Sequence, residues 1–257
     1  MTGNLCRLLP LLLLFTLLHG CSTLGPARTV DGKVPLNKAV TEQSEDQLLD
    51  VWIELFDPGE LPEDEDKALG LSMEIRAAEA RYLPEQLRAS MENTGYWGAV
   101  RVVPQDTAGH ELQVRGKILE SDGERLVLEI MALDATGREW FKRTYREEIE
   151  HARYIKGGQD GQEVFQSLYN TIANDLAEHR RKLEAAEILA IRRVAAMRCA
   201  ADLAPDTFAG YLEKDKDRFR VVHLPSADDP MYRRVLAIRD RDFLLIDTLN
   251  GHFDNFT

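Results

Sequence analysis

Apolar and polar residues alternate along three consecutive stretches of the chain, residues 112–118, 126–130 and 138–149. Such alternation is typical of strands that bury one face. An Asp-Gly pair at 122–123 separates the first two stretches, and Asp-Ala-Thr-Gly at 134–137 separates the next two. Both sequences favour tight turns. The region therefore predicts an antiparallel three-strand meander.

The residues before the meander predict a strand, a helix and a second strand. Leu49, Val51, Ile53 and Leu55 would share one face of a strand over 48–56, and a short strand is expected over 99–103. Between them, residues 71–93 carry apolar side chains at helical spacing. Pro84 interrupts this pattern, and we expect it to open a second helix at its first position, where a missing N–H costs nothing.

Helical spacing returns after the meander, over 164–176 and again over 188–200. A short strand is expected over 219–224, and a helix or helix pair from Pro230 nearly to the last residue. The predicted fold class is α+β, with a mixed sheet that contains the meander and is packed by helices, followed by a helical carboxy-terminal extension. We expect an α/β domain over 48–182 and the extension over 183–257. The end of the sequence carries two Phe and no clear helix stop, which is consistent with a truncated member of a longer family.

The amino-terminal residues read as an export signal. Arg7 precedes an apolar run over 8–18, and Gly20 and Cys21 follow it. The run is shorter than the ~20 residues that span a bilayer, which argues against an uncleaved anchor. Residues 18–21, Leu-His-Gly-Cys, resemble the lipobox of bacterial lipoproteins, although His19 stands where that family usually has a small residue. The resemblance implies cleavage after residue 20, which makes 1–20 a signal peptide, and lipid attachment at Cys21. The alternative is an ordinary signal peptide with Cys21 as a bystander.

The residues that follow the signal bear on localisation. By resemblance to enterobacterial lipoproteins, Ser22 permits transfer to the outer membrane, so we expect a lipid-anchored protein on its periplasmic face. Residues 21–47 show little apolar periodicity and contain Gly-Pro, Asp-Gly and Pro breakers. They are therefore predicted to be a flexible tether.

Charge and cysteine content restrict the possible partners. Removal of residues 1–20 takes away one arginine and no acid, so the charge changes from −12 to −13. Such an acidic chain argues against nucleic acid as a partner. Cys6 leaves with the signal and Cys21 would be lipidated, so Cys199 stands alone and no internal disulfide can form. Its place on an apolar helical stripe predicts a buried small hydrophobe.

The sequence contains no recognisable catalytic or metal-binding signature. No two histidines stand at metal-ligand spacing, and no Gly-x-Ser-x-Gly is present. Acidic pairs are too common in this chain to identify a glycosidase pair. We therefore assign no catalytic residue, metal or cofactor. Tyr96 and Trp97, beside two glycines at a helix–strand junction, are the candidate partner surface. The alternative is that Trp97 fills the end of the core.

Several segments resemble a known periplasmic domain: residues 82–88, 94–104, 133–140 and 143–145. They are similar to a small α/β domain that recurs in the amino-terminal part of TolB, in curli-secretion lipoproteins and in lipoprotein activators of peptidoglycan synthases. The resemblance covers about 48–176 and rests on the Asp-Ala-Thr-Gly turn and the order of elements. It implies protein–protein contacts in the periplasm rather than catalysis.

The resulting hypothesis is an outer-membrane lipoprotein that acts as a protein–protein interaction module, as scaffold or regulator of an envelope complex. Its expected partners are the membrane, through acyl chains on Cys21, and a periplasmic protein. One alternative is a cell-envelope hydrolase acting on cell-wall glycan or peptide. Another is a structural subunit of a secretion assembly.

Overall fold

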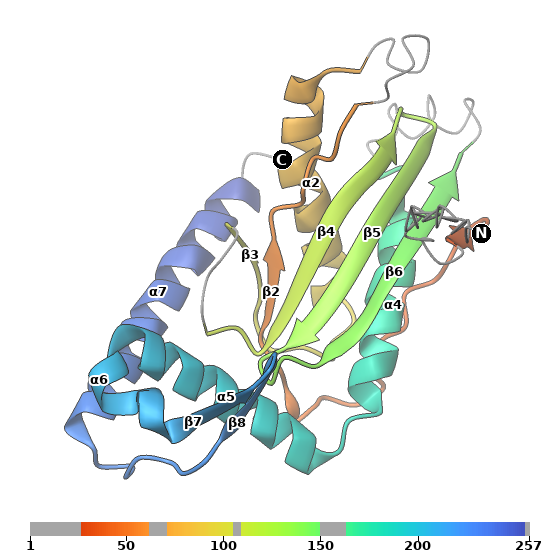
Figure 1. The fold of residues 1–257 in the computed structure, drawn as a ribbon. Coiled ribbons are helices and arrows are strands. Elements are labelled where there is room, and N and C mark those ends of the chain that lie inside the picture. The colour runs from red at the N-terminus through yellow and green to blue at the C-terminus, as the bar shows by residue number, and fades with distance from the viewer. Residues whose placement is uncertain (1–26, 62–70, 105–108, 150–162, 255–257) are drawn as a thin grey trace, which may run out of the picture.

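A computed structural model of the chain describes residues 27–61, 71–104, 109–149 and 163–254 (Figure 1). The predicted signal peptide over 1–20 and the predicted lipidation site, Cys21, lie outside these residues. The elements in chain order are β1 (Arg28–Val30), η1 (Glu45–Gln47), β2 (Val51–Glu54), α2 (Met73–Glu92), β3 (Val100–Val103), β4 (Leu112–Ser121), β5 (Arg125–Asp134), β6 (Glu139–Glu148), α4 (Gln166–Arg181), α5 (Ala185–Leu203), α6 (Pro205–Phe208), η2 (Ala209–Tyr211), β7 (Leu212–Asp215), β8 (Arg218–Val221) and α7 (Pro230–Asp254).

The main sheet has the strand order β1-β6-β5-β4-β2-β3. Strands β4, β5 and β6 pair antiparallel, whereas β2 runs parallel to both β3 and β4. Gly123 and Gly137 have φ of 89° and 78°, a backbone region that glycine enters at little cost, and each lies in a turn of the meander. The predicted fold class, a mixed sheet with an antiparallel meander packed by helices and followed by a helical extension, is confirmed.

One face of the sheet is covered by α2 and α4, which pack against each other (Figure 1). The alternating apolar residues of β4 and β5 point into this interface, and Leu112, Val114, Leu128 and Ile130 are fully buried there. A single core joins these strands to all three of the helices α2, α4 and α5. The predicted inward faces of the meander are therefore the main apolar core of the protein.

Pro84 does not open a second helix, because α2 runs unbroken from Met73 to Glu92 with Pro84 inside it. A proline here leaves the carbonyl of Ala80 without its helical N–H donor. That carbonyl instead accepts a hydrogen bond from the main-chain N–H of Phe56 at 2.9 Å, just beyond the end of β2. Tertiary packing thus satisfies the group that the proline frees, and the helix continues.

The predicted tether over 21–47 needs correction from residue 28 onward. β1 adds a strand to the sheet and pairs in parallel with β6. Beyond β1, the main-chain N–H groups of Val34 and Asn37 donate to side chains of α4, Ser167 at 3.2 Å and Asn174 at 2.8 Å. These contacts hold the segment against the domain.

The extension contains more than helices. β7 and β8 form a hairpin, of which only the second strand was expected from the sequence, and α7 is one continuous helix rather than a pair. α5, α6 and the hairpin gather at one end of the sheet, while α7 runs along its β3 edge (Figure 1). No helix among the described residues is long and apolar enough to cross a membrane.

Candidate functional site

Trp97 is a core residue and does not form the exposed surface considered for it. Its side chain is 6% exposed, and its ring centroid lies 6.3 Å from that of Trp140 in a stacked arrangement. Tyr96 is half-buried and packs against the same core. Burying so large an apolar ring stabilises the fold more than leaving it in water. The candidate partner surface at Tyr96 and Trp97 is therefore wrong for Trp97, and the alternative, that Trp97 fills the end of the core, holds.

The Asp-Ala-Thr-Gly turn is built around the buried carboxylate of Asp134. Five donors reach this carboxylate: the main-chain N–H and hydroxyl of Thr136, the main-chain N–H and Nε of Arg138, and Nε1 of Trp140. The last two distances are 3.1 and 3.0 Å. A buried carboxylate surrounded by donors in this way is structural, because no oxygen remains free for a substrate.

The same turn holds the extension in place. The carbonyl of Ala135 accepts a hydrogen bond at 3.0 Å from Arg198 of α5, and that of Thr136 accepts one at 2.8 Å from the main-chain N–H of Phe219 in β8. A Cβ on Gly137 would lie 1.8 Å from the carbonyl oxygen of Asp217 at the hairpin tip. Only glycine allows this approach, so the motif that carries the sequence resemblance is here a docking platform.

A groove of about 610 Å³ lies between this turn, α5 and β8, and we call it the arginine groove. Its lining is mainly apolar, and its polar lining residues are Thr136, Glu187, four arginines and one histidine. The apolar lining residues are Ala186, Ala190, Ile191, Val194, Phe219, Val221, Val222 and Leu224, and the basic ones are Arg138, Arg193, Arg218, Arg220 and His223.

Two of these arginines are available to a ligand. Arg138 binds Asp134 and Glu187, and Arg220 binds Glu213. Arg193 and Arg218 are exposed and make no ion pair with any residue that the structure describes. Arg218 donates one hydrogen bond, at 3.5 Å, to the hydroxyl of Thr136, and the two guanidinium groups together create a local excess of positive charge in a chain of net charge −12. The groove can therefore receive a ligand that is both anionic and apolar.

A second, smaller cavity of about 230 Å³ contains Glu111 and Asp50, which precede β4 and β2. Glu111 accepts a hydrogen bond from the main-chain N–H of Asp50 at 2.9 Å, and its other oxygen lies 3.6 Å from Nε of Arg192. Burial raises the pKa of Glu111 to about 7, and the hydrogen bond from Asp50 opposes this shift. Asp50 accepts hydrogen bonds from the N–H of Ala99 and from Arg101.

Cys199 is buried on α5, as its helical stripe predicts. Burial raises the pKa of its thiol, which disfavours the reactive thiolate. Within the described ranges, no group of three histidine, cysteine or acidic side chains is arranged to hold a metal ion.

Neither the arginine groove nor the small cavity could be found from the sequence, since each joins residues that lie far apart in it. Comparison with models of known protein families and with curated proteins finds no match for this chain.

Proposed function

We propose that the chain is an outer-membrane-anchored periplasmic lipoprotein that acts as a protein–protein interaction module, as scaffold or regulator of an envelope complex. Acyl chains on Cys21 attach it to the membrane. A segment of a periplasmic protein, with carboxylates and apolar side chains, binds in the arginine groove. The observation that carries this proposal is the mainly apolar lining of the groove together with two guanidinium groups that have no carboxylate partner among the described residues.

Size and charge favour a binding groove over a catalytic cleft. The arginine groove, at about 610 Å³, falls within the ~300–1,000 Å³ typical of ligand sites, whereas the cavity at Glu111 lies below that range. The carboxylate oxygens of Glu111 and Asp50 are also occupied, because they accept hydrogen bonds from main-chain N–H groups and pair with arginines. A cell-envelope hydrolase is therefore the weaker hypothesis. A structural subunit of a secretion assembly would require self-association, which sedimentation of the full chain measures.

The position of β1 limits the reach of the anchored protein. From Cys21 to Arg28 the chain spans at most ~25 Å when fully extended, at ~3.6 Å per residue. A domain anchored through Cys21 would therefore stay close to the membrane, and its partner must be bound there.

The Cys21→Ser variant is expected to lose its acyl chains and to remain uncleaved. Triacylation places three chains in the bilayer, and each buried methylene contributes ~0.8 kcal/mol, so the anchored form should not detach. Intact mass and membrane fractionation should show a cleaved, triacylated wild type in the outer membrane and an unprocessed variant. A wild type without lipid mass in the soluble fraction would contradict the anchor and leave the groove proposal standing.

Reversing the charge of the groove is expected to abolish partner binding. A photo-crosslinker at Ala190, which lines the groove, should give one discrete adduct in the periplasm, and Arg193→Glu with Arg218→Glu should reduce it at least tenfold. Arg81→Glu with Arg181→Glu, at exposed positions of α2 and α4 outside the groove, is the matched control for a double charge reversal and should leave the adduct unchanged. An equal yield of crosslinked adduct in the groove variant and the control would show that the groove is not the docking site.

A further inference from the structure

The outermost strand of the sheet, β3, is covered by the last turns of α7. The amide side chain of Asn250 accepts a hydrogen bond at 2.8 Å from the main-chain N–H of Val102 and donates one at 3.1 Å to its carbonyl. The Asn250 side chain thereby binds both main-chain groups that Val102 directs away from the sheet. A neighbouring strand would make the same pair of bonds.

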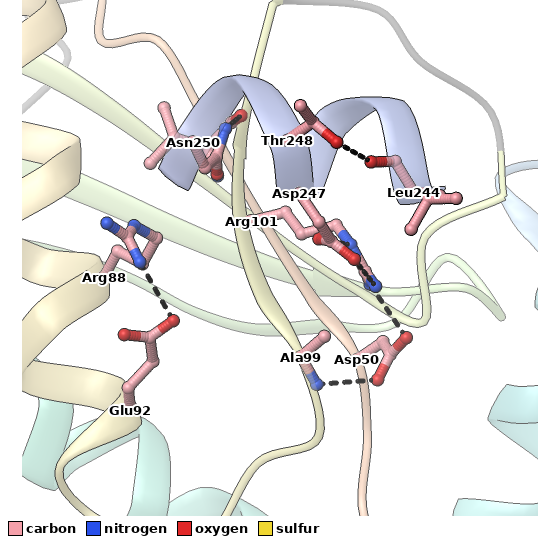
Figure 2. A network of polar contacts seen from close by, with 10 residues as sticks. Asp50, Arg88, Glu92, Ala99, Arg101, Leu244, Asp247, Thr248 and Asn250 are labelled. Carbon is pink, nitrogen blue, oxygen red and sulfur yellow. Dashed lines mark hydrogen bonds and ion pairs between the residues drawn. The ribbon is translucent and has the colours of Figure 1, made fainter. Parts of the chain in front are cut away.

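A second contact fixes the same strand. Arg101 is 6% exposed, yet it is held by two carboxylates: Asp247 of α7, at 2.6 and 3.0 Å, and Asp50, at 3.0 Å. Its guanidinium also lies 4.6 Å from the ring centroid of Phe243. Figure 2 shows Asp247 reaching down from α7 to this guanidinium. A segment that replaces α7 must supply a carboxylate in place of Asp247, because a buried arginine that loses an ionic partner destabilises the protein.

The end of α7 that makes these contacts has little apolar burial. Leu244, Leu245 and Leu249 are between 59% and 67% exposed. Among the residues of α7 whose side chains are described, only Val235, toward the other end of the helix, is buried. Phe243 packs edge-on against Trp52, with ring centroids 5.6 Å apart, and the turns of α7 beyond Phe243 are held on β3 mainly by the side chains of Asp247 and Asn250. Water can replace each neutral bond of Asn250 at a net cost of ~1 kcal/mol, whereas the bonds of Asp247 to Arg101 are charged and contribute ~1.5–3 kcal/mol.

The edge of β3 is already partly open. A cavity of about 260 Å³ lies beside it, lined by Gly98, Ala99 and Val100 of the strand region and by Asp247 and Asn250 of α7. The main-chain N–H and C=O groups of successive residues point to opposite edges of a strand. Those of Val100 therefore point to the same outer edge as those of Val102. The cavity, which Arg88 and Glu92 of α2 also line, leaves space beside Val100, and a strand added at Val102 requires that α7 move away.

We propose that the carboxy-terminal half of α7 is a displaceable cap on β3, and that an extended segment of a partner protein, with a carboxylate placed to bind Arg101, replaces it by adding a strand to the sheet. Main-chain bonds to Val100 and Val102 would provide affinity, and the carboxylate would provide specificity. This surface is separate from the arginine groove, and neither proposal depends on the other.

The test compares Asn250→Ala with Thr248→Ala in the full chain, purified in detergent. Thr248 is exposed and its hydroxyl donates only to the carbonyl of Leu244 within α7, so it is a matched control. The probe is the peptide acetyl-Val-Glu-Val-Glu-Val-amide, and its counterpart with a central proline lacks one main-chain donor. Removing the cap should raise the affinity for the first peptide about tenfold over the control and should not help the second. Amide exchange of Val102 should rise in Asn250→Ala alone and should fall when the peptide binds.

Three results would overturn the proposal. Equal peptide affinity in Asn250→Ala and Thr248→Ala would show that α7 does not compete for the edge. Equal binding of the proline peptide would show that no strand is added. Self-association of Asn250→Ala with protection of Val102 would identify a second copy of the chain, rather than a partner's segment, as the occupant.

Discussion

Replacing Asp134 by alanine is expected to lower the free energy of unfolding by about 3–5 kcal/mol, because several donors lose their acceptor and each buried donor left unsatisfied costs ~1–3 kcal/mol. The substitution leaves the indole N–H of Trp140, the main-chain N–H of Thr136 and the guanidinium of Arg138 without the acceptor they share. Trp140 is buried, so its N–H cannot turn to water instead. Urea unfolding followed by circular dichroism measures the change.

Asp122→Ala is the matched control, since Asp122 also accepts main-chain N–H groups in a turn of the meander, from Glu124 at 3.0 Å and Arg125 at 2.7 Å. Asp122 is exposed, so its loss should cost ~1 kcal/mol or less. If the two variants lose the same stability, burial does not set the importance of Asp134. Asp134→Asn should fall between them, because an amide keeps one acceptor oxygen and loses the charge.

The Asp134 turn also explains which part of the fold could be predicted. The Asp-Ala-Thr-Gly sequence of the turn and the alternation of apolar and polar residues in the strands beside it are local signals. Such signals were sufficient to predict the meander and the presence of most helices. Pro84 shows the limit of such rules. A proline normally interrupts a helix, but the main-chain N–H of Phe56 satisfies the carbonyl that Pro84 leaves free, and that contact comes from another element.

The elements that the sequence did not reveal are short and are stabilised by distant partners. β1 is only Arg-Thr-Val, too short to show a period, and it forms because Arg28 pairs in register with Tyr145 at the far end of the meander. β7, Leu-Glu-Lys-Asp, carries one apolar residue and gains its place from β8 and the Asp134 turn. Burial with tertiary partners outweighs local propensity at both strands.

The arginine groove could not be predicted from the sequence either, because it too is formed by residues that lie far apart in the chain. The aromatic pair at Tyr96 and Trp97 attracts attention in the sequence, but a large ring beside a core is usually buried in it, and Trp97 stacks on Trp140. Arg193 and Arg218 look like ordinary surface charges. They become a site only because the Asp134 turn docks the hairpin beside α5 and places both in one groove.

Glu111→Gln is expected to make the protein more stable at pH 8 and to leave its stability nearly unchanged at pH 4.5. The pKa of Glu111 is about 7 in the folded protein against an ordinary value of 4.5. Between these values the folded state binds more protons than the unfolded state, so the contribution of Glu111 to stability falls as the pH rises from 4.5 to 7. Above pH 7 the full penalty is present, and the shift corresponds to about 2–4 kcal/mol at 1.36 kcal/mol per pKa unit.

Glutamine removes this penalty and keeps the contact that orders the start of β2, because its amide oxygen can still accept the main-chain N–H of Asp50. Unfolding free energies of both proteins at pH 4.5, 6 and 8 should therefore diverge steadily, with the variant gaining. Glu139→Gln, an exposed position on β6, should change stability by less than ~0.5 kcal/mol at each pH. A constant difference between wild type and Glu111→Gln across the range would mean that the charged form of Glu111 is adequately paired by Arg192 and Arg239. In that case burial would not control its titration, and the cavity beside α5 and α7 would be more polar than its geometry implies.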